Sequence, residues 1–275
     1  MAIISFWNEK DKENGQTSSI IAVANQMAIE HNYRILLVDA TFLDKTIEKA
    51  FWRFKENKAL KQLQGNRIDV SSGAEGLISA VASNKATPEI IANFTRVVYK
   101  NRLDVLLGLK TEIPEEHEKS IMLYKDMLTA ANKYYDLIFV DMMKSYRRAT
   151  SKALLEKSDM IIYTMPPNLD NLDNYTRLRQ TDPIISSNKV MPLLAKADEL
   201  SNYNVRNTSR YLKYKYIIPC IPYNPRFMEA CNEARVSEFF VRPKLSGTAM
   251  KDPFIAEVER VCTAIIAKLK ELNLS

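Results

Sequence analysis

The chain of 275 residues is poor in the side chains that build disulfide or metal frameworks. It has three cysteines, an odd number with no close pair: Cys220, Cys231 and Cys262. Its two histidines, His31 and His117, lie far apart, and neither has a second histidine or a cysteine at the spacing of metal ligands. These absences argue against a disulfide scaffold and a CxxC metal site, and they favour a reducing compartment.

Long apolar runs and flexible linkers are also missing. No apolar stretch approaches the roughly 20 residues of a membrane-spanning helix, and the first strand begins almost at Met1, which leaves no space for a signal peptide. No Gly/Ser-rich or Pro-rich linker divides the chain, and its 46% hydrophobic and 26% charged residues are typical of a globular protein. We therefore predict a single domain over residues 1–275 in the cytoplasm, without a membrane partner.

The formal net charge of +6 favours anionic partners such as nucleotides or nucleic acid. Net charge affects the rate at which a protein meets charged partners and its solubility, and it does not indicate the fold. A basic soluble surface is the simpler interpretation, and a nonspecific DNA-binding patch is the alternative.

Short apolar runs alternate with helical patterns along the chain. The strand candidates are residues 2–7, 34–39, 103–107, 135–141, 159–164, 189–194 and 216–221. Continuous apolar runs of this kind are required in parallel strands that are covered on both faces. Helical patterns lie between most of them, the first over residues 17–30. The fold class is α/β, with an open, mostly parallel sheet and helices on both faces.

Two segments in the first half of the chain are less regular. Residues 40–66 predict a basic amphipathic helix with an aromatic pair, Phe51 and Trp52. Large rings are normally buried, so we expect this pair in the core rather than on a contact surface. In residues 88–109 we expect a short additional strand.

Two further segments are open to two interpretations. Residues 202–215 carry basic side chains among tyrosines, a pattern found in nucleic-acid binding but also in an exposed helix with inward-packed tyrosines, which we favour. Residues 254–272 carry a helical apolar stripe. We expect this helix to dock onto the sheet, and a membrane-binding amphipathic helix is the alternative.

The loop after the first strand is a candidate phosphate site. Ligands of open α/β sheets bind beyond the carboxyl ends of the strands, and this loop ends in Gly15, Gln16, Thr17 and Ser18 at a helix start. A P-loop needs converging N–H groups, a helix N-terminus, a lysine for the outer phosphates and a hydroxyl for Mg²⁺. Gly15, Thr17 and the helix start supply part of this set. The alternative is that the segment only caps a helix.

Two aspartates follow further strand candidates. Asp39 ends the second strand, and Asp141 ends the strand over residues 135–141. We expect Asp141 to hold the water shell of a metal ion and Asp39 to position an attacking water. Alternatively, both are carboxylates in turns. We predict that Gly15, Asp39 and Asp141 converge at one edge of the sheet.

These motifs, in this order, resemble the ParA/MinD family of P-loop ATPases, whose loop reads KGGxGKT and whose next strand ends in a VDxD-like motif. The resemblance spans the chain from Ile3 to the last helix. Residues 15–18 fall on the family's Gly-Lys-Thr-Thr, 37–40 on its second-strand motif, 135–141 on its Walker B strand, and 221–225 with 229–230 on its base-binding loop.

The loop departs from the family pattern at its charged positions. Gln16 replaces the phosphate-contacting lysine, and Lys12 and Glu13 replace the first two glycines. The family's intermonomer lysine aligns with Asp11, but Lys10 and Lys12 flank it, and a shift of one residue would restore a lysine. Losing a charged hydrogen bond weakens nucleotide binding by about tenfold to more than a hundredfold. Hydrolysis suffers more, because a positioned cation stabilises charge that develops in the transition state.

The resemblance implies ATP and Mg²⁺ as cofactors and a homodimer as the assembled form. The residues that it implies for nucleotide binding are Lys10, Lys12, Asn14, Gly15, Gln16, Thr17, Ser18, Pro222 and Asn224. Thr17 and Asp141 are implied as metal ligands, and Asp39 and Asp141 as catalytic residues.

The predicted function is that of a spatial-organising or scaffold protein, a nucleotide-dependent dimer with slow or absent ATP hydrolysis. The implied partners are a protein cargo or pilus or partition machinery, and the nearest branch is the TadZ-like one that localises pilus machinery. An active partition ATPase that binds DNA nonspecifically is one alternative. A nucleotide-free interaction module is the other.

Overall fold

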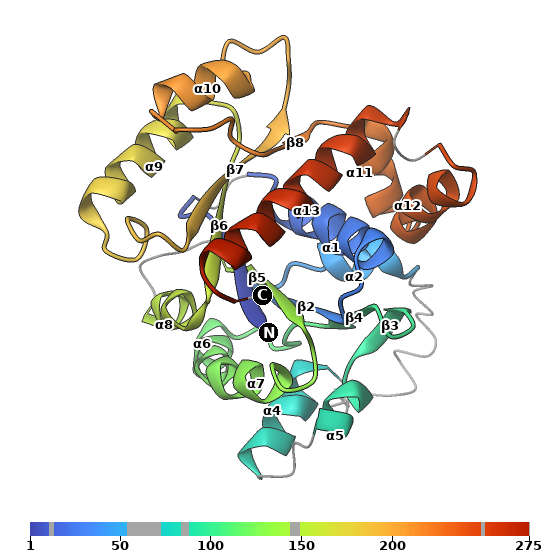
Figure 1. The fold of residues 1–275 in the computed structure, drawn as a ribbon. Helices are drawn as coiled ribbons and strands as arrows, with labels where there is room; N and C mark the ends of the chain where they lie inside the picture. Colours follow the sequence, from blue (N-terminus) through green and yellow to red (C-terminus); the bar gives the residue numbers. More distant parts are fainter. Residues whose placement is uncertain (11–13, 54–72, 84–87, 144–148, 249–250, 275) are drawn as a thin grey trace.

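The computed structural model describes residues 1–10, 14–53, 73–83, 88–143, 149–248 and 251–274. Within these residues, eight strands form one sheet in the order β3-β4-β2-β5-β1-β6-β7-β8 (Figure 1). All neighbouring strands are parallel except β3, which is antiparallel to β4. The strands are β1 (Ala2–Trp7), β2 (Ile35–Ala40), β3 (Arg96–Tyr99), β4 (Leu103–Leu106), β5 (Leu137–Met142), β6 (Met160–Met165), β7 (Val190–Ala197) and β8 (Cys220–Pro222). The predicted open, mostly parallel sheet is confirmed.

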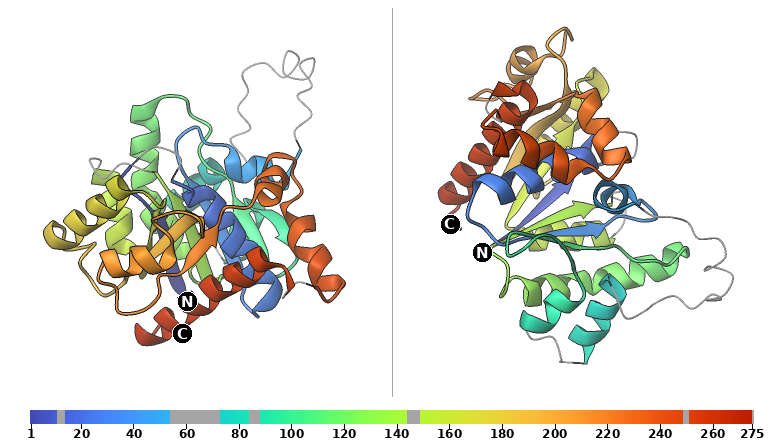
Figure 2. Two further views of the ribbon diagram at one scale, coloured as in Figure 1. Left: turned by 90° about the horizontal axis from the view of Figure 1, so that it is seen from above. Right: turned by 90° about the vertical axis from the view of Figure 1, so that its right-hand side faces the viewer.

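Helices cover both faces of the sheet, as Figure 2 shows. One face carries α1 (Gln16–Glu30), α2 (Thr46–Phe51), α11 (Pro225–Asn232), α12 (Val236–Leu245) and α13 (Pro253–Glu271). The other carries α4 (Ala74–Ala82), α5 (Pro88–Asn93), α6 (Pro114–Met122), α7 (Tyr124–Ala131), α8 (Ala149–Lys157), α9 (Leu169–Thr181) and α10 (Val205–Tyr211).

The central strand β1 shows why its residues form a doubly covered strand. Successive side chains of a strand point to opposite faces. Ile4 and Phe6 enter the core beneath α1 and α13, whereas Ile3 and Trp7 enter the core on the opposite face. Each of these side chains is at most 2% exposed. The continuous apolar run therefore fills two cores at once.

Two predicted elements are shorter than expected. The strand predicted over 216–221 pairs only over Cys220–Pro222, and Ile217 is 64% exposed. Pro219 has no N–H to donate, and its carbonyl accepts a hydrogen bond from the Leu194 amide at 3.0 Å, which begins the pairing there. The second element is the helix predicted over residues 40–66, whose predicted first residue was wrong.

That helix, α2, begins at Thr46, whose amide donates to the Asp44 carboxylate at 2.8 Å. It ends at Phe51, because Trp52 adopts an extended conformation. Residues 54–72 lie outside the described part of the chain. Phe51 and Trp52 are partly buried against the core, as predicted.

The remaining ambiguous segments are settled by packing. The short strand expected in residues 88–109 is β3. Tyr203 and Tyr214 pack inward beside α10, as predicted, but Tyr211 is 47% exposed and donates a hydrogen bond to Asp173 instead. The apolar stripe of α13 is buried in the core with α1, which confirms the docked helix. Among the helices that the structure describes, none is long and apolar enough to cross a bilayer.

Candidate functional site

The candidate site lies where β1, β2 and β5 end. β5 lies between β2 and β1, and the parallel register of β2 and β5 places Asp39 directly opposite Asp141. The loop that leaves β1 at the same edge leads to Gly15 and the start of α1. The predicted convergence of Gly15, Asp39 and Asp141 is therefore confirmed.

Gly15 forms a tight entry to α1. Its φ of 78° lies in the left-handed region, and a Cβ there would come within 2.8 Å of the Ala195 Cβ. Only glycine fits both conditions. The Asn14 carboxamide accepts a hydrogen bond from the Gln16 amide at 3.0 Å, and the Ser18 hydroxyl donates to the Gly15 carbonyl at 3.0 Å. The start of α1 is thus held by its own loop.

We expect Gly15→Ala to reduce the free energy of unfolding by about 2 kcal/mol, since left-handed strain and overpacking add. Gly247→Ala is the matched control, because Gly247 also has a positive φ of 68° but open space around it. It should cost about 1 kcal/mol. Urea denaturation of both variants measures the difference, and equal losses would show that the Ala195 contact is unimportant.

Gln16 occupies the position of the family's lysine, and its side chain is directed toward Asp141, a predicted metal ligand. Its Nε2 donates to Asp141 Oδ1 at 2.7 Å and to the Met142 carbonyl at 2.7 Å. The side chain is fully buried. A neutral amide therefore links α1 to β5, and it adds no positive charge to the loop.

Beside this link, buried polar atoms at the start of α1 have no hydrogen-bond partner within the described residues: Gln16 Oε1, Thr17 Oγ1 and Ser19 Oγ. Thr17 is only 8% exposed. Buried hydroxyls without partners are rare in folded proteins and call for an explanation such as an ion or water. The Thr17 hydroxyl fits a Mg²⁺ ligand, and the N-terminus of α1 fits an anion. Gln16 does not fit a P-loop, because it is neutral and stands where a P-loop has a lysine.

Asp39 is a buried carboxyl at the edge of this site. Its Oδ1 accepts hydrogen bonds from the Thr41 amide at 2.9 Å and the Thr41 hydroxyl at 2.6 Å. Burial raises the pKa of Asp39 to about 8, the Thr41 bonds oppose the rise, and the charge of Asp141 adds to it. A Cβ at Gly108 would lie 3.2 Å from Asp39 Oδ2, so the carboxyl is closely packed. Asp39 is therefore largely protonated at neutral pH.

The loop lysines are only partly described. Lys10 forms an ion pair with Asp170 at the start of α9, within the same chain. Asn8 fixes this part of the loop, because its Nδ2 donates to the Thr164 carbonyl and its Oδ1 accepts from the Lys10 amide. Lys12 lies outside the described residues. Binding of nucleotide by either lysine stays a prediction.

The residues expected to bind the base lie farther along the same edge. Pro222 ends β8, and Asn224 Oδ1 accepts from the Phe227 amide at 3.0 Å as the N-cap of α11. The Tyr223 amide donates to the Ala197 carbonyl at 3.0 Å, which joins this loop to the end of β7. Their contact with a base stays a prediction.

Sequence reasoning missed one residue of this edge, Lys196. It lies near the end of β7, and its Cγ comes within 3.3 Å of the position that a Gly15 Cβ would take. The signal was available, because Lys196 follows the strand predicted over 189–194.

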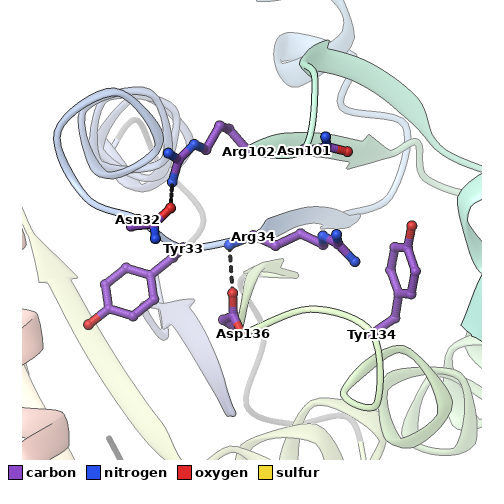
Figure 3. A pocket seen from close by; sticks show the side chains of 7 residues that line it. All are labelled: Asn32, Tyr33, Arg34, Asn101, Arg102, Tyr134 and Asp136. Atoms are coloured by element: carbon purple, nitrogen blue, oxygen red, sulfur yellow. Dashed lines mark hydrogen bonds between the residues drawn. The ribbon is translucent and has the colours of Figure 1, made fainter.

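A polar cavity of about 310 Å³ opens at the opposite edge of the sheet, where β2 and β5 begin (Figure 3). It is lined by Asn32, Tyr33, Arg34, Asn101, Arg102, Tyr134 and Asp136. The Arg34 amide donates to Asp136 at 2.8 Å, and its guanidinium lies 4.5 Å from the centre of the Tyr134 ring. This cavity is separate from the candidate site.

The chain matches no protein-family model and no curated protein sequence. Solved structures resemble it over nearly its whole length. A ParA family ATPase from Chlorobium tepidum has a TM-score of 0.68 and 16% identity, covering 94% of this chain and 96% of that chain. The septum site-determining protein MinD from Pyrococcus horikoshii, complexed with Mg-ADP, has a TM-score of 0.65 and 15% identity. The match covers 97% of this chain and 98% of that chain.

A third similar structure is a putative plasmid partition protein from Borrelia burgdorferi bound to AMPPNP. Its TM-score is 0.63 at 18% identity, covering 97% of this chain and 99% of that chain. At such identities the likeness concerns the fold. This chain has the ParA/MinD type of P-loop fold.

Proposed function

We propose that this protein is a divergent ParA/MinD-type spatial-organising or scaffold protein. It binds ATP with Mg²⁺ at the loop between β1 and α1, forms a homodimer with the nucleotide, and hydrolyses it slowly or not at all. Its partners on this proposal are a protein cargo or pilus or partition machinery. The observation that carries nucleotide binding is the buried Thr17 hydroxyl at the N-terminus of α1, which has no hydrogen-bond partner among the described residues.

Nucleotide binding is supported by what the site retains. The N-terminus of α1 presents backbone N–H groups and the positive end of its dipole, which favour an anion. Thr17 Oγ1 is buried without a partner in the described part of the chain. Thr17 and Asp141 would hold Mg²⁺, which when bound neutralises phosphate charge.

Slow hydrolysis is supported by what the site lacks. The Gln16 amide has no charge with which to stabilise a phosphoryl group in transfer. It also engages one oxygen of Asp141, so a metal ion must share or displace that hydrogen bond. Asp39 carries a proton near neutrality and is therefore a poor acceptor for the proton of an attacking water.

The hydrogen bonds of Gln16 favour a second candidate, the nucleotide-free interaction module. A buried amide that already engages Asp141 and Met142 stabilises the site without any ligand. On this view the fold serves only to present surfaces to partners. The two candidates differ in whether ATP binds.

Titration calorimetry of the full chain with ATP and Mg²⁺ tests the choice, with sedimentation to follow assembly. We expect heat of binding and an ATP-dependent rise to the mass of a dimer. Thr17→Val should weaken the binding of Mg²⁺-ATP by about tenfold, since it removes one metal ligand. Thr129→Val is the matched control, because Thr129 lies on α7 outside the site and its hydroxyl already bonds to the Lys125 carbonyl. Absence of binding by the unaltered chain would favour the interaction module.

A further inference from the structure

The end of β7 has an irregular backbone beside the candidate site. The pairing of β7 with β8 shifts register between Ala195 and Ala197. Lys196, between them, has a φ of 51°, in a region that residues other than glycine seldom adopt. Bulges of this kind re-aim a side chain and are frequent near functional sites. The backbone therefore places Lys196 in a way that a regular strand would not.

The side chain of Lys196 lies beside Gly15, at the start of α1. Its Cγ and Cε lie 3.3 and 3.6 Å from the position of a Cβ built on Gly15. The ammonium is one bond beyond Cε, so it also lies close to Gly15. Ala195 is fully buried against Gly15, and Ala197 is tied to Tyr223, so both neighbours of Lys196 are held.

We propose that Lys196 supplies, from β7, a positive charge for nucleotide binding, and that its ammonium binds the phosphate groups of a nucleoside triphosphate from the side of Gly15. This inference rests on the proposed nucleotide binding, and it identifies Lys196 as a cation that contacts the phosphate groups. Lys196 already interacts within the protein, so a phosphate group would take over or share that interaction.

Two other residues near the loop are less suited to this task. Gln16 is neutral and directed toward Asp141. Lys10 is paired with Asp170, in the direction of α9. The stem of Lys196, in contrast, lies against Gly15 itself, at the N-terminus of α1 where an anion is favoured.

Lys196→Met tests the charge, because methionine keeps an unbranched apolar stem. We expect it to weaken ATP binding by about tenfold to a hundredfold, the range for a lost charged hydrogen bond. Lys196→Arg should retain most of the affinity. The matched control is Lys213→Met, since Lys213 also has a positive φ, 49°, but follows α10. Thermal unfolding without ligand checks that each variant is folded.

Adenosine and tripolyphosphate, titrated separately, identify the part of the ligand that Lys196 contacts. We expect Lys196→Met to weaken tripolyphosphate binding and to leave adenosine binding unchanged. A loss confined to adenosine would assign Lys196 to the base and overturn the inference. Equal ATP affinity in Lys196→Met and the unaltered chain would also overturn it while nucleotide binding stands. If the unaltered chain bound no ATP, both proposals would fail together.

Discussion

Replacing Gln16 with lysine is expected to tighten ATP binding by about tenfold to a hundredfold, the value of a hydrogen bond to a charged group. The new ammonium would lie beside Asp141, whose carboxylate compensates for the cost of burying it. It would also lower the pKa of Asp39 through the shared site and favour the ionised carboxylate. ATP hydrolysis should accelerate as well, because the cation stabilises the transferring phosphoryl group.

Gln16→Met separates the two effects of this substitution. Methionine removes the hydrogen bonds to Asp141 and Met142 without adding charge. Calorimetry should then show tighter ATP binding for the lysine variant alone. If the methionine variant gained as much affinity, release of Asp141 rather than charge would be the cause. An unchanged affinity in both variants would remove Gln16 from the nucleotide site.

The stability of the nucleotide-free protein is expected to fall as pH rises, because of Asp39. Its pKa is about 8 when folded and 3.8 ordinarily, and burial is the main cause of the rise. The folded state therefore binds the proton more tightly than the unfolded state. The stabilising contribution is fully present below about pH 4 and is lost as pH rises toward 8. A difference of about four pKa units amounts to about 5 kcal/mol in the free energy of unfolding.

Asp39→Asn should remove most of this pH dependence. Asparagine has the same shape, its carbonyl oxygen can accept both hydrogen bonds from Thr41, and it does not ionise. Urea denaturation at pH 5 and pH 8 measures the slope for both proteins, and the other titrating groups cancel in the comparison. The variant should be clearly the more stable protein at pH 8. Equal slopes in the two proteins would mean that Asp39 is not protonated in the folded state at pH 5 to 8.

Most of the buried strands could be predicted from the sequence, because each fills two cores with a continuous apolar run. Their order in the sheet was not predicted. The strand predicted over residues 2–7 begins and ends at the same residues as β1 (Ala2–Trp7). Parallel strands place their carboxyl ends at one edge, so the location of Asp39 and Asp141 at the same edge followed from the fold class. That residues 1–275 form a single domain stays a prediction.

Features that depend on tertiary contacts could not be predicted. Gln16 and Asp141 are 125 positions apart, and their hydrogen bond requires α1 and β5 to be in place. The bulge at Lys196 arises where β7 shifts register against β8, and no local sequence pattern predicts that shift. The helix α2 ends at Phe51 although the basic amphipathic pattern continues beyond it.

We propose that the site binds ATP but hydrolyses it poorly, because Gln16 stands in place of a cation. Single-turnover hydrolysis tests it most directly, with radiolabelled ATP, Mg²⁺ and the full chain in excess, beside the Gln16→Lys variant. We predict that the unaltered chain binds the ATP and leaves nearly all of it intact, whereas the lysine variant converts it to ADP faster. Conversion by the unaltered chain as fast as by the lysine variant would contradict the claim.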